Sequence, residues 1–222
     1  IRDDLVTGVQ TCALPIYLDI ISKNIASDLE SIHELRTKRE LAFEASLRWL
    51  NLSEGDGSLS ISEVAFASRT YLQAAALIHF NATTSGYEAL KSSGTLNHLA
   101  GRDIESILYE YYDTVSRIMH QERDFNENVR LLGLQAREKR PEELKGWEFH
   151  NPQALTHERF ESLQPVYRKW LEGNSMTALF AAPQLARPVL LEYEKLESLG
   201  TAFRQMKDRK STRLNSSHQI IS

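Results

Sequence analysis

The stretch DIESILYEYYDTVSRIMHQERDFNENVRLL, Asp103–Leu132, decides the fold class of this 222-residue chain. Its apolar residues recur at steps of three and four, which is the period of one face of an α-helix. The residues on this face are Ile104, Ile107, Leu108, Tyr111, Val115, Ile118, Phe125, Val129 and Leu132. The pattern predicts a long amphipathic helix that begins near Arg102, takes Asp103 as its N-terminal cap and ends before Pro141.

The same period predicts helices on both sides of this stretch. Upstream, we expect one long helix over 17–50, with Asp28 and other charged residues away from its apolar face. That face carries Leu18, Ile21, Ile25, Leu29, Ile32 and Leu35, and after a weaker stretch the pattern recovers at Leu41, Ala45 and Leu47. A second helix is expected over 61–80, where Ser60 and Glu63 have the spacing of a capping box.

The downstream half contains prolines that limit its helices. A helix is expected to begin at Thr156, with a kink or break at Pro165, and the last straight helix to begin near Val189, after Pro183 and Pro188. No segment alternates polar and apolar residues over the length of a strand. We therefore predict an all-α fold, an elongated antiparallel helical bundle.

The two ends of the chain are related through their codons. Each residue from Ile16 back to Arg2 can be paired with one from Asp208 to Ser222 so that the two codons are reverse complements. The DNA that results resembles a sequencing adaptor. We interpret residues 1–16 and 208–222 as translated adaptor, without specific packing, and residues 17–207 as an N-terminally truncated helical bundle domain.

Composition excludes several classes of function. The net charge of −4 gives no electrostatic reason to expect a nucleic-acid partner. Cys12, the only cysteine, lies in the N-terminal tail, so disulfides, thiolate metal sites and cysteine nucleophiles are not expected. The longest apolar run, at 74–78, is far too short to cross a bilayer.

One stretch, Glu54–Glu63, resembles the second half of a calcium-binding loop. Glu63 would occupy the bidentate last position, but Leu52 falls at the first position, where an aspartate is required. A turn followed by a helix cap is therefore the favoured interpretation.

No other pattern indicates a metal, a cofactor or a reaction. Apart from His218 in the C-terminal tail, the histidines lie at positions 33, 79, 98, 120, 150 and 157 and do not form a paired ligand motif on one helix. The chain contains no nucleophile elbow, phosphate-binding loop or dinucleotide fingerprint. We expect no cofactor and no metal, and the sequence names no catalytic residue.

The segment FNATTSGYEALKSSGTLNHLAGRDIESILYEYYD, residues 80–113, carries a family resemblance. Tyr87, Leu90, Ser92, Ser93 and Gly94 follow one another in an order that resembles an uncharacterised bacterial family, domain of unknown function 6090. The resemblance extends over nearly all of residues 17–207. It implies a membrane span upstream of residue 17, absent from this chain, and a bundle outside the cytoplasm, but it supplies no activity.

Within that motif, the residues themselves favour a structural role. Gly94 suits the left-handed position that ends a short helix, and Ser92 and Ser93 can bond the carbonyls freed there. A binding role for these three residues remains the alternative.

Two functions are therefore expected from different classes. The first is an extracytoplasmic interaction or sensory module of a single-pass membrane protein, with an unidentified protein partner. The second is a small-molecule-binding or enzymatic bundle, not membrane-bound, with a pocket near Tyr87, Ser92, His98 and Tyr111.

Overall fold

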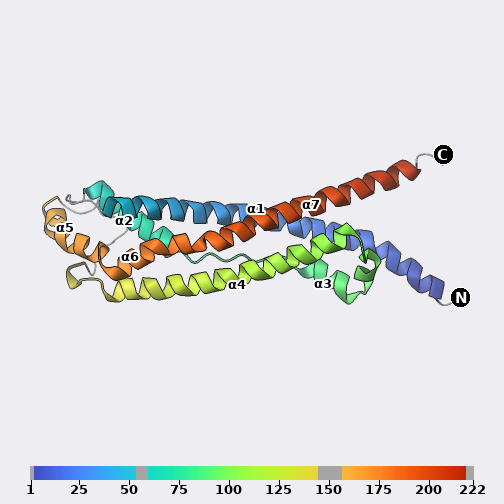
Figure 1. Cartoon of the computed structure of the whole chain (residues 1–222), viewed down its shortest axis with the longest axis horizontal. Coiled ribbons are helices and arrows are strands. Elements are labelled where there is room, and N and C mark those ends of the chain that lie inside the picture. The colour runs from blue at the N-terminus through green and yellow to red at the C-terminus, as the bar shows by residue number, and fades with distance from the viewer. Residues whose placement is uncertain (1–2, 54–59, 145–156, 219–222) are drawn as a thin grey trace. The chain divides into compact units, whose positions relative to one another are not determined.

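The computed structural model describes residues 3–53, 60–144 and 157–218, which are mostly helical and contain no strand (Figure 1). The α-helices are α1 (Asp3–Ser53), α2 (Ile61–Ala74), α3 (Ser85–Ser92), α4 (Asp103–Glu138), α5 (His157–Leu171), α6 (Asn174–Ala181) and α7 (Arg187–His218). Short 3-10 helices occur at η1 (Thr95–Leu99), η2 (Glu142–Leu144) and η4 (Ala182–Ala186). The prediction of an all-α helical bundle is confirmed.

The chain divides into two compact units. Unit 1 contains residues 1–34, 80–120 and 191–222, and unit 2 contains residues 35–79 and 121–190. The helices α1, α4 and α7 each contribute one part to each unit, and none of the three is interrupted at the boundary (Figure 1). Each unit therefore depends on segments that are distant in sequence.

In unit 1, α7 runs antiparallel to α1 and to α4. As the residue numbers of the contacting residues increase along α7, those of their partners on α1 and α4 decrease. The ion pairs that show this order are Lys207–Asp19, Lys195–Glu110 and Arg117–Glu192. Gly200 extends the α1–α7 contact, because a Cβ atom there would lie 2.9 Å from Ile25 Cγ2.

Apolar side chains at the expected spacing form the core of each unit. In unit 1 the buried set includes Ile21, Ile25, Ile32, Phe80, Leu90, Leu108, Tyr111, Val115, Ile118, Tyr193, Leu196 and Phe203. In unit 2 it includes Trp49, Val64, Ala67, Phe125, Val129, Tyr167, Trp170, Met176, Leu179 and Phe180. The predicted apolar faces of α4 and of the first half of α1 are thus the faces that these helices bury. In the second half of α1 the prediction was wrong for Leu41 and Leu47, which are exposed, while Ala42 and Trp49 are buried.

Asp28 is the exception, and its predicted position was wrong. We expected it away from the apolar face, yet its side chain is only 2% exposed. The reason is its spacing, because it lies three residues after Ile25 and four before Ile32, on the same helical stripe. Its partners are described below.

The helix boundaries agree with the sequence at several caps. Ser60 and Glu63 form the predicted capping box, in which the Ser60 side chain accepts from the Glu63 N–H and Glu63 accepts from the Ser60 N–H. Pro188 stands at the second position of α7, where a missing N–H is tolerated. The loop expected at 54–59 lies outside the described residues.

Several expected features differ from the structure. The first helix, expected over 17–50, spans Asp3–Ser53. The second helix ends at Ala74 instead of Phe80. Pro165 lies inside α5 without breaking it. Asp103, expected as the N-terminal cap, is the first residue of α4. The Gly101 N–H, just before this helix, donates instead to the Glu105 carboxylate at 2.8 Å.

Two helical glycines give opposite predictions for the same substitution. A Cβ at Gly200 would meet Ile25 and Leu29 at 2.9 and 3.0 Å, whereas a Cβ at Gly133 of α4 would meet nothing within 4 Å. We expect Gly200→Ala to lower the free energy of unfolding by about 1–3 kcal/mol through overpacking. We expect Gly133→Ala to raise it by about 0.5–1 kcal/mol through backbone entropy.

Thermal and urea unfolding followed by circular dichroism measure both changes. A stabilising Gly200→Ala would contradict the close packing of α7 on α1.

Candidate functional site

Residues 76–84 connect α2 to α3 as an extended, non-helical segment, which we call the strap. Most of its residues are exposed and Phe80 is buried, and a segment without helical or strand bonds needs other partners for the peptide groups that water does not reach. Side chains from α1 and α4 supply these partners at Thr83 in unit 1 and at Ile78 in unit 2.

At the Thr83 end, the carboxylate of Asp28 accepts two hydrogen bonds. The Thr83 N–H donates to Asp28 Oδ1 at 3.0 Å, and the Tyr111 hydroxyl donates to Asp28 Oδ2 at 3.1 Å. Asp28 therefore joins α1, the strap and α4 through one buried side chain.

Three tyrosine rings form a cluster that begins at the partner of this carboxylate, Tyr111. The rings of Tyr87 and Tyr112 are stacked with centroids 4.0 Å apart, and Tyr112 meets Tyr111 edge to face at 5.1 Å. Tyr111 is fully buried, and Tyr87 and Tyr112 are 6% and 8% exposed. Aromatic pairs in these arrangements add to the stability gained from burial alone.

Burial shifts the ionisation of this cluster in a consistent direction. Burial raises the pKa of the Asp28 carboxyl, although the hydrogen bonds from Thr83 and Tyr111 oppose this shift. Burial, followed by the charge of Asp28, also raises the pKa of the Tyr111 and Tyr112 hydroxyls, so both phenols stay protonated at neutral pH. Burial therefore disfavours the charged form of all three side chains, Asp28, Tyr111 and Tyr112.

Two polar atoms of unit 1 are buried without a hydrogen-bond partner among the described residues. They are the Tyr112 hydroxyl and Asn24 Nδ2. Buried groups of this kind usually contact an ordered water molecule.

At the Ile78 end of the strap, the side-chain amide of Asn126 from α4 contacts both backbone groups of one residue. Asn126 Nδ2 donates to the Ile78 carbonyl oxygen at 2.7 Å, and Asn126 Oδ1 accepts from the Ile78 N–H at 3.3 Å. The amide therefore takes the place of a neighbouring strand. Asn126 Nδ2 also lies 3.2 Å from His79 Nδ1.

A buried ion pair lies at the same end of the strap. Arg39 Nη2 lies 3.5 Å from Glu122 Oε1 and 3.4 Å from the Ile78 carbonyl oxygen, and its guanidinium stands over the Phe125 ring at 4.7 Å. Both charged side chains are almost fully buried. Arginine suits this position because its planar group can bond and stack at once.

The structure brings together only part of the pocket predicted from the sequence. Tyr87 and Tyr111 both belong to the tyrosine cluster, linked through Tyr112. Ser92 is exposed, and His98 is half-buried in η1, and no hydrogen bond or ring contact joins either to those tyrosines within the described chain.

The serines and the glycine of the family motif have the local contacts expected of a helix end. Ser92 and Ser93 donate to the carbonyl oxygens of Ala89 and Leu90 at 3.1 and 3.0 Å. Gly94 has φ of 69°, the left-handed conformation. This geometry accounts for the three residues without a ligand.

A groove in unit 2 was not foreseen from the sequence. It has a volume of about 620 Å³ and lies between the end of α4, η2, α5 and the start of α6. Trp170, Met176 and Val166 are among its apolar walls, and Lys139 and Lys169 are among its charged residues. Trp170 is held in place by a hydrogen bond of 3.1 Å from its Nε1 to the Ala136 carbonyl oxygen.

The described residues contain no group of three or more His, Cys, Asp or Glu side chains placed to hold a metal ion. The carboxylate of Glu63, considered above for calcium, accepts from the Ser60 N–H at 2.6 Å. Among the helices that the structure describes, none is both long and apolar enough to cross a membrane.

Comparison of the chain with protein-family models, with curated proteins and with solved structures finds no match.

The raised pKa of Asp28 predicts a pH dependence of stability. The folded protein keeps the Asp28 proton at pH values where the unfolded chain, with an aspartate pKa of about 3.9, has released it. The free energy of unfolding should therefore fall as pH rises from about 4 through the raised pKa. Asp28→Asn keeps an acceptor for Thr83 and cannot ionise, so it should lose this slope and be more stable at pH 7.

Urea unfolding from pH 4 to 8 tests this, with Asp28→Leu as the second variant. Leucine accepts no hydrogen bond, so it should destabilise the protein by about 1–3 kcal/mol for each donor left unsatisfied. Equal slopes for Asp28→Asn and the unmodified chain would show that Asp28 is ionised freely in the fold.

The contact between Asn126 and the strap predicts a position-specific cost. Asn126→Ala should leave the Ile78 N–H unsatisfied and lower the free energy of unfolding by about 1–3 kcal/mol. Asn128→Ala, two residues further along α4 at an exposed position, is the matched control and should change stability by less than about 0.5 kcal/mol. Equal effects at both positions would contradict the role of Asn126.

Proposed function

We propose that this chain is the extracytoplasmic interaction or sensory module of a membrane-anchored protein, with a helical bundle that acts without catalysis. The observation that carries the proposal is the continuity of α1, α4 and α7, each of which takes part in both units. Rigid secondary elements of this kind can carry a displacement from one site to another.

The use of the buried polar groups supports the same proposal. Asp28 and Asn126 bond the backbone of the strap, and Arg39 bonds the strap and Glu122. These side chains fix the position of a connecting segment, whereas a catalytic centre would present its polar groups to a substrate. The membrane anchor itself is proposed from the family resemblance.

Labelling of the complete gene product in its native cell tests the anchoring and the orientation. Glu138→Cys places a thiol at the exposed end of α4, in a background whose native cysteines are replaced by serine. We expect the protein to sediment with membranes after carbonate extraction. A membrane-impermeant maleimide should label the thiol in intact spheroplasts.

A cytoplasmic protein with an exposed cysteine is the control and should react only after lysis. Recovery of the bundle in the supernatant, or labelling that requires lysis, would overturn the proposal.

A further inference from the structure

The groove of unit 2 has the size and composition of a small-molecule site. Its volume of about 620 Å³ lies within the range of about 300–1,000 Å³ that is usual for ligand pockets. Its apolar lining comes from Pro141, Pro165, Val166, Trp170 and Met176. Such a lining receives an apolar body, but it does not by itself select a ligand.

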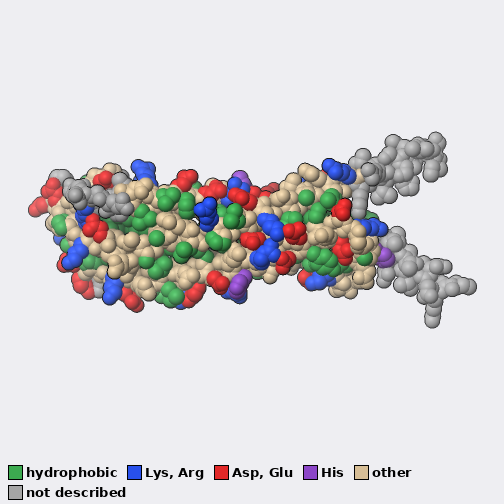
Figure 2. Space-filling view, viewed as in Figure 1, with side chains coloured by type: hydrophobic (Ala, Val, Ile, Leu, Met, Phe, Trp, Pro, Cys, Tyr) green, Lys and Arg blue, Asp and Glu red, His purple; other side chains and the backbone are tan. Residues whose placement is uncertain are grey.

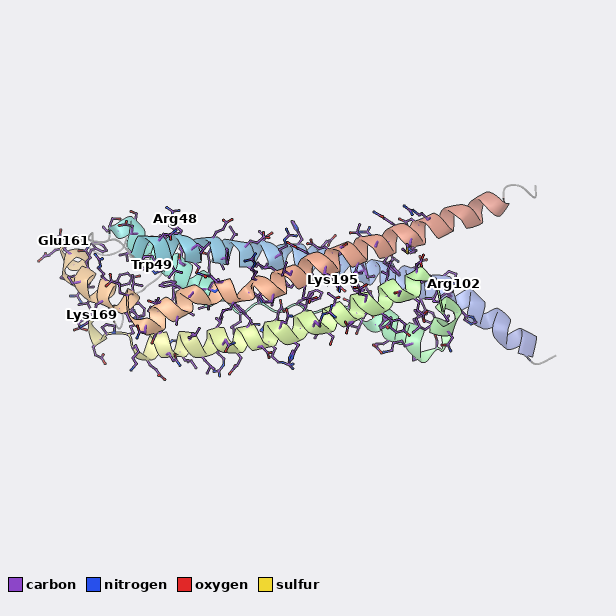
Figure 3. The ribbon with its side chains drawn as sticks, viewed as in Figure 1. Arg48, Trp49, Arg102, Glu161, Lys169 and Lys195 are labelled. Carbon is purple, nitrogen blue, oxygen red and sulfur yellow. The ribbon has the colours of Figure 1, made fainter. Side chains whose placement is uncertain are left out.

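The charged residues of the groove favour ligands of one charge, which is negative. Lys139 and Lys169 both line it, against one carboxylate, that of Glu143. Both lysines are exposed, and within the described chain neither has an ion-pair partner. Lys169 is labelled on α5 in Figure 3. Elsewhere on the protein, basic residues such as Lys195 and Lys207 pair with acidic ones.

The visible face of the protein carries side chains of both charges (Figure 2). Figure 2 shows basic and acidic side chains interspersed along the visible face, without one large patch of either sign. The lining of the groove, with two lysines and one carboxylate, has a small excess of positive charge beside its apolar walls. It complements a ligand that joins an apolar body to one anionic group.

The start of α6 adds to the positive character of the same groove. Gly173, Asn174 and Ser175 line it, and Gly173 caps the helix without a side-chain hydrogen bond. The N-terminal end of a helix carries a partial positive charge. This contribution has the same sign as the two lysines.

We propose that this groove binds a small amphipathic anion, with its apolar body against Val166, Trp170 and Met176 and its carboxylate or phosphate group near Lys139 and Lys169. The site lies in unit 2 alone and does not depend on membrane anchoring. It goes beyond the proposed module function, because it names a ligand class that such a module would bind.

Calorimetric titration of the full chain with sodium decanoate, below its micelle concentration, tests the proposal. Decyl phosphate, decanol and decyltrimethylammonium are the comparison probes, matched in apolar length. We expect saturable binding of decanoate or decyl phosphate, and binding at least about tenfold weaker for decanol and for the cation. The anion that binds more tightly identifies the head group.

Three variants connect the binding to the groove. The double variant Lys139→Gln/Lys169→Gln should weaken binding of the anion at least about tenfold, and Ser175→Phe should weaken it by filling the groove. Lys195→Gln on α7, in unit 1, is the matched control and should leave binding unchanged (Figure 3). Circular dichroism confirms that each variant is folded.

Three results would overturn the proposal. They are the absence of saturable binding, decanol binding as tightly as the anions, and anion binding that survives both the lysine and the groove-filling substitutions. A protein that binds the anion but proves to be cytoplasmic would overturn only the anchoring proposal.

Discussion

Two peptide groups of the strap bond to helix side chains instead of to other backbone, and this constraint acts on both helices that supply those side chains. The strap has no neighbouring strand, so α1 and α4 provide Asp28 and Asn126 as acceptors and donors for its backbone. These two helices cannot therefore have purely apolar inner faces. The polar interruptions of their stripes, and with them the positions of Tyr111 and Arg39, follow from the need to hold the strap.

The helical period predicted which faces of α1 and α4 would be buried, because burial of apolar residues determines the orientation of an amphipathic helix. It did not predict Asp28, although a stripe in which Ile25 and Ile32 flank an aspartate at helical spacing contains that information. The early end of α2 could not be read from AAALIHF, since helix propensity in that segment is overridden by tertiary bonds to Asn126.

The candidate sites differ in how far sequence alone could reveal them. Gly94 and its serines were predictable because their bonds are local, within three residues along the chain. The groove combines α4, α5 and α6, and its lysines gain meaning only when Trp170 and Met176 are placed beside them. A ligand in this groove and a sensory role for the bundle are compatible, since binding would occur in one unit while α1, α4 and α7 continue into the other.

The interleaving of the two units also sets an order for folding during synthesis. Residues 35–79 and 121–190 of unit 2 have all been translated before α7 reaches its second half, whereas unit 1 needs residues from the beginning, the middle and the end of the chain. Unit 2 is thus complete in sequence at residue 190, when most of α7, which unit 1 needs, has still to be added. Until α7 arrives, the apolar stripe around Ile25 stays open to solvent or to a chaperone.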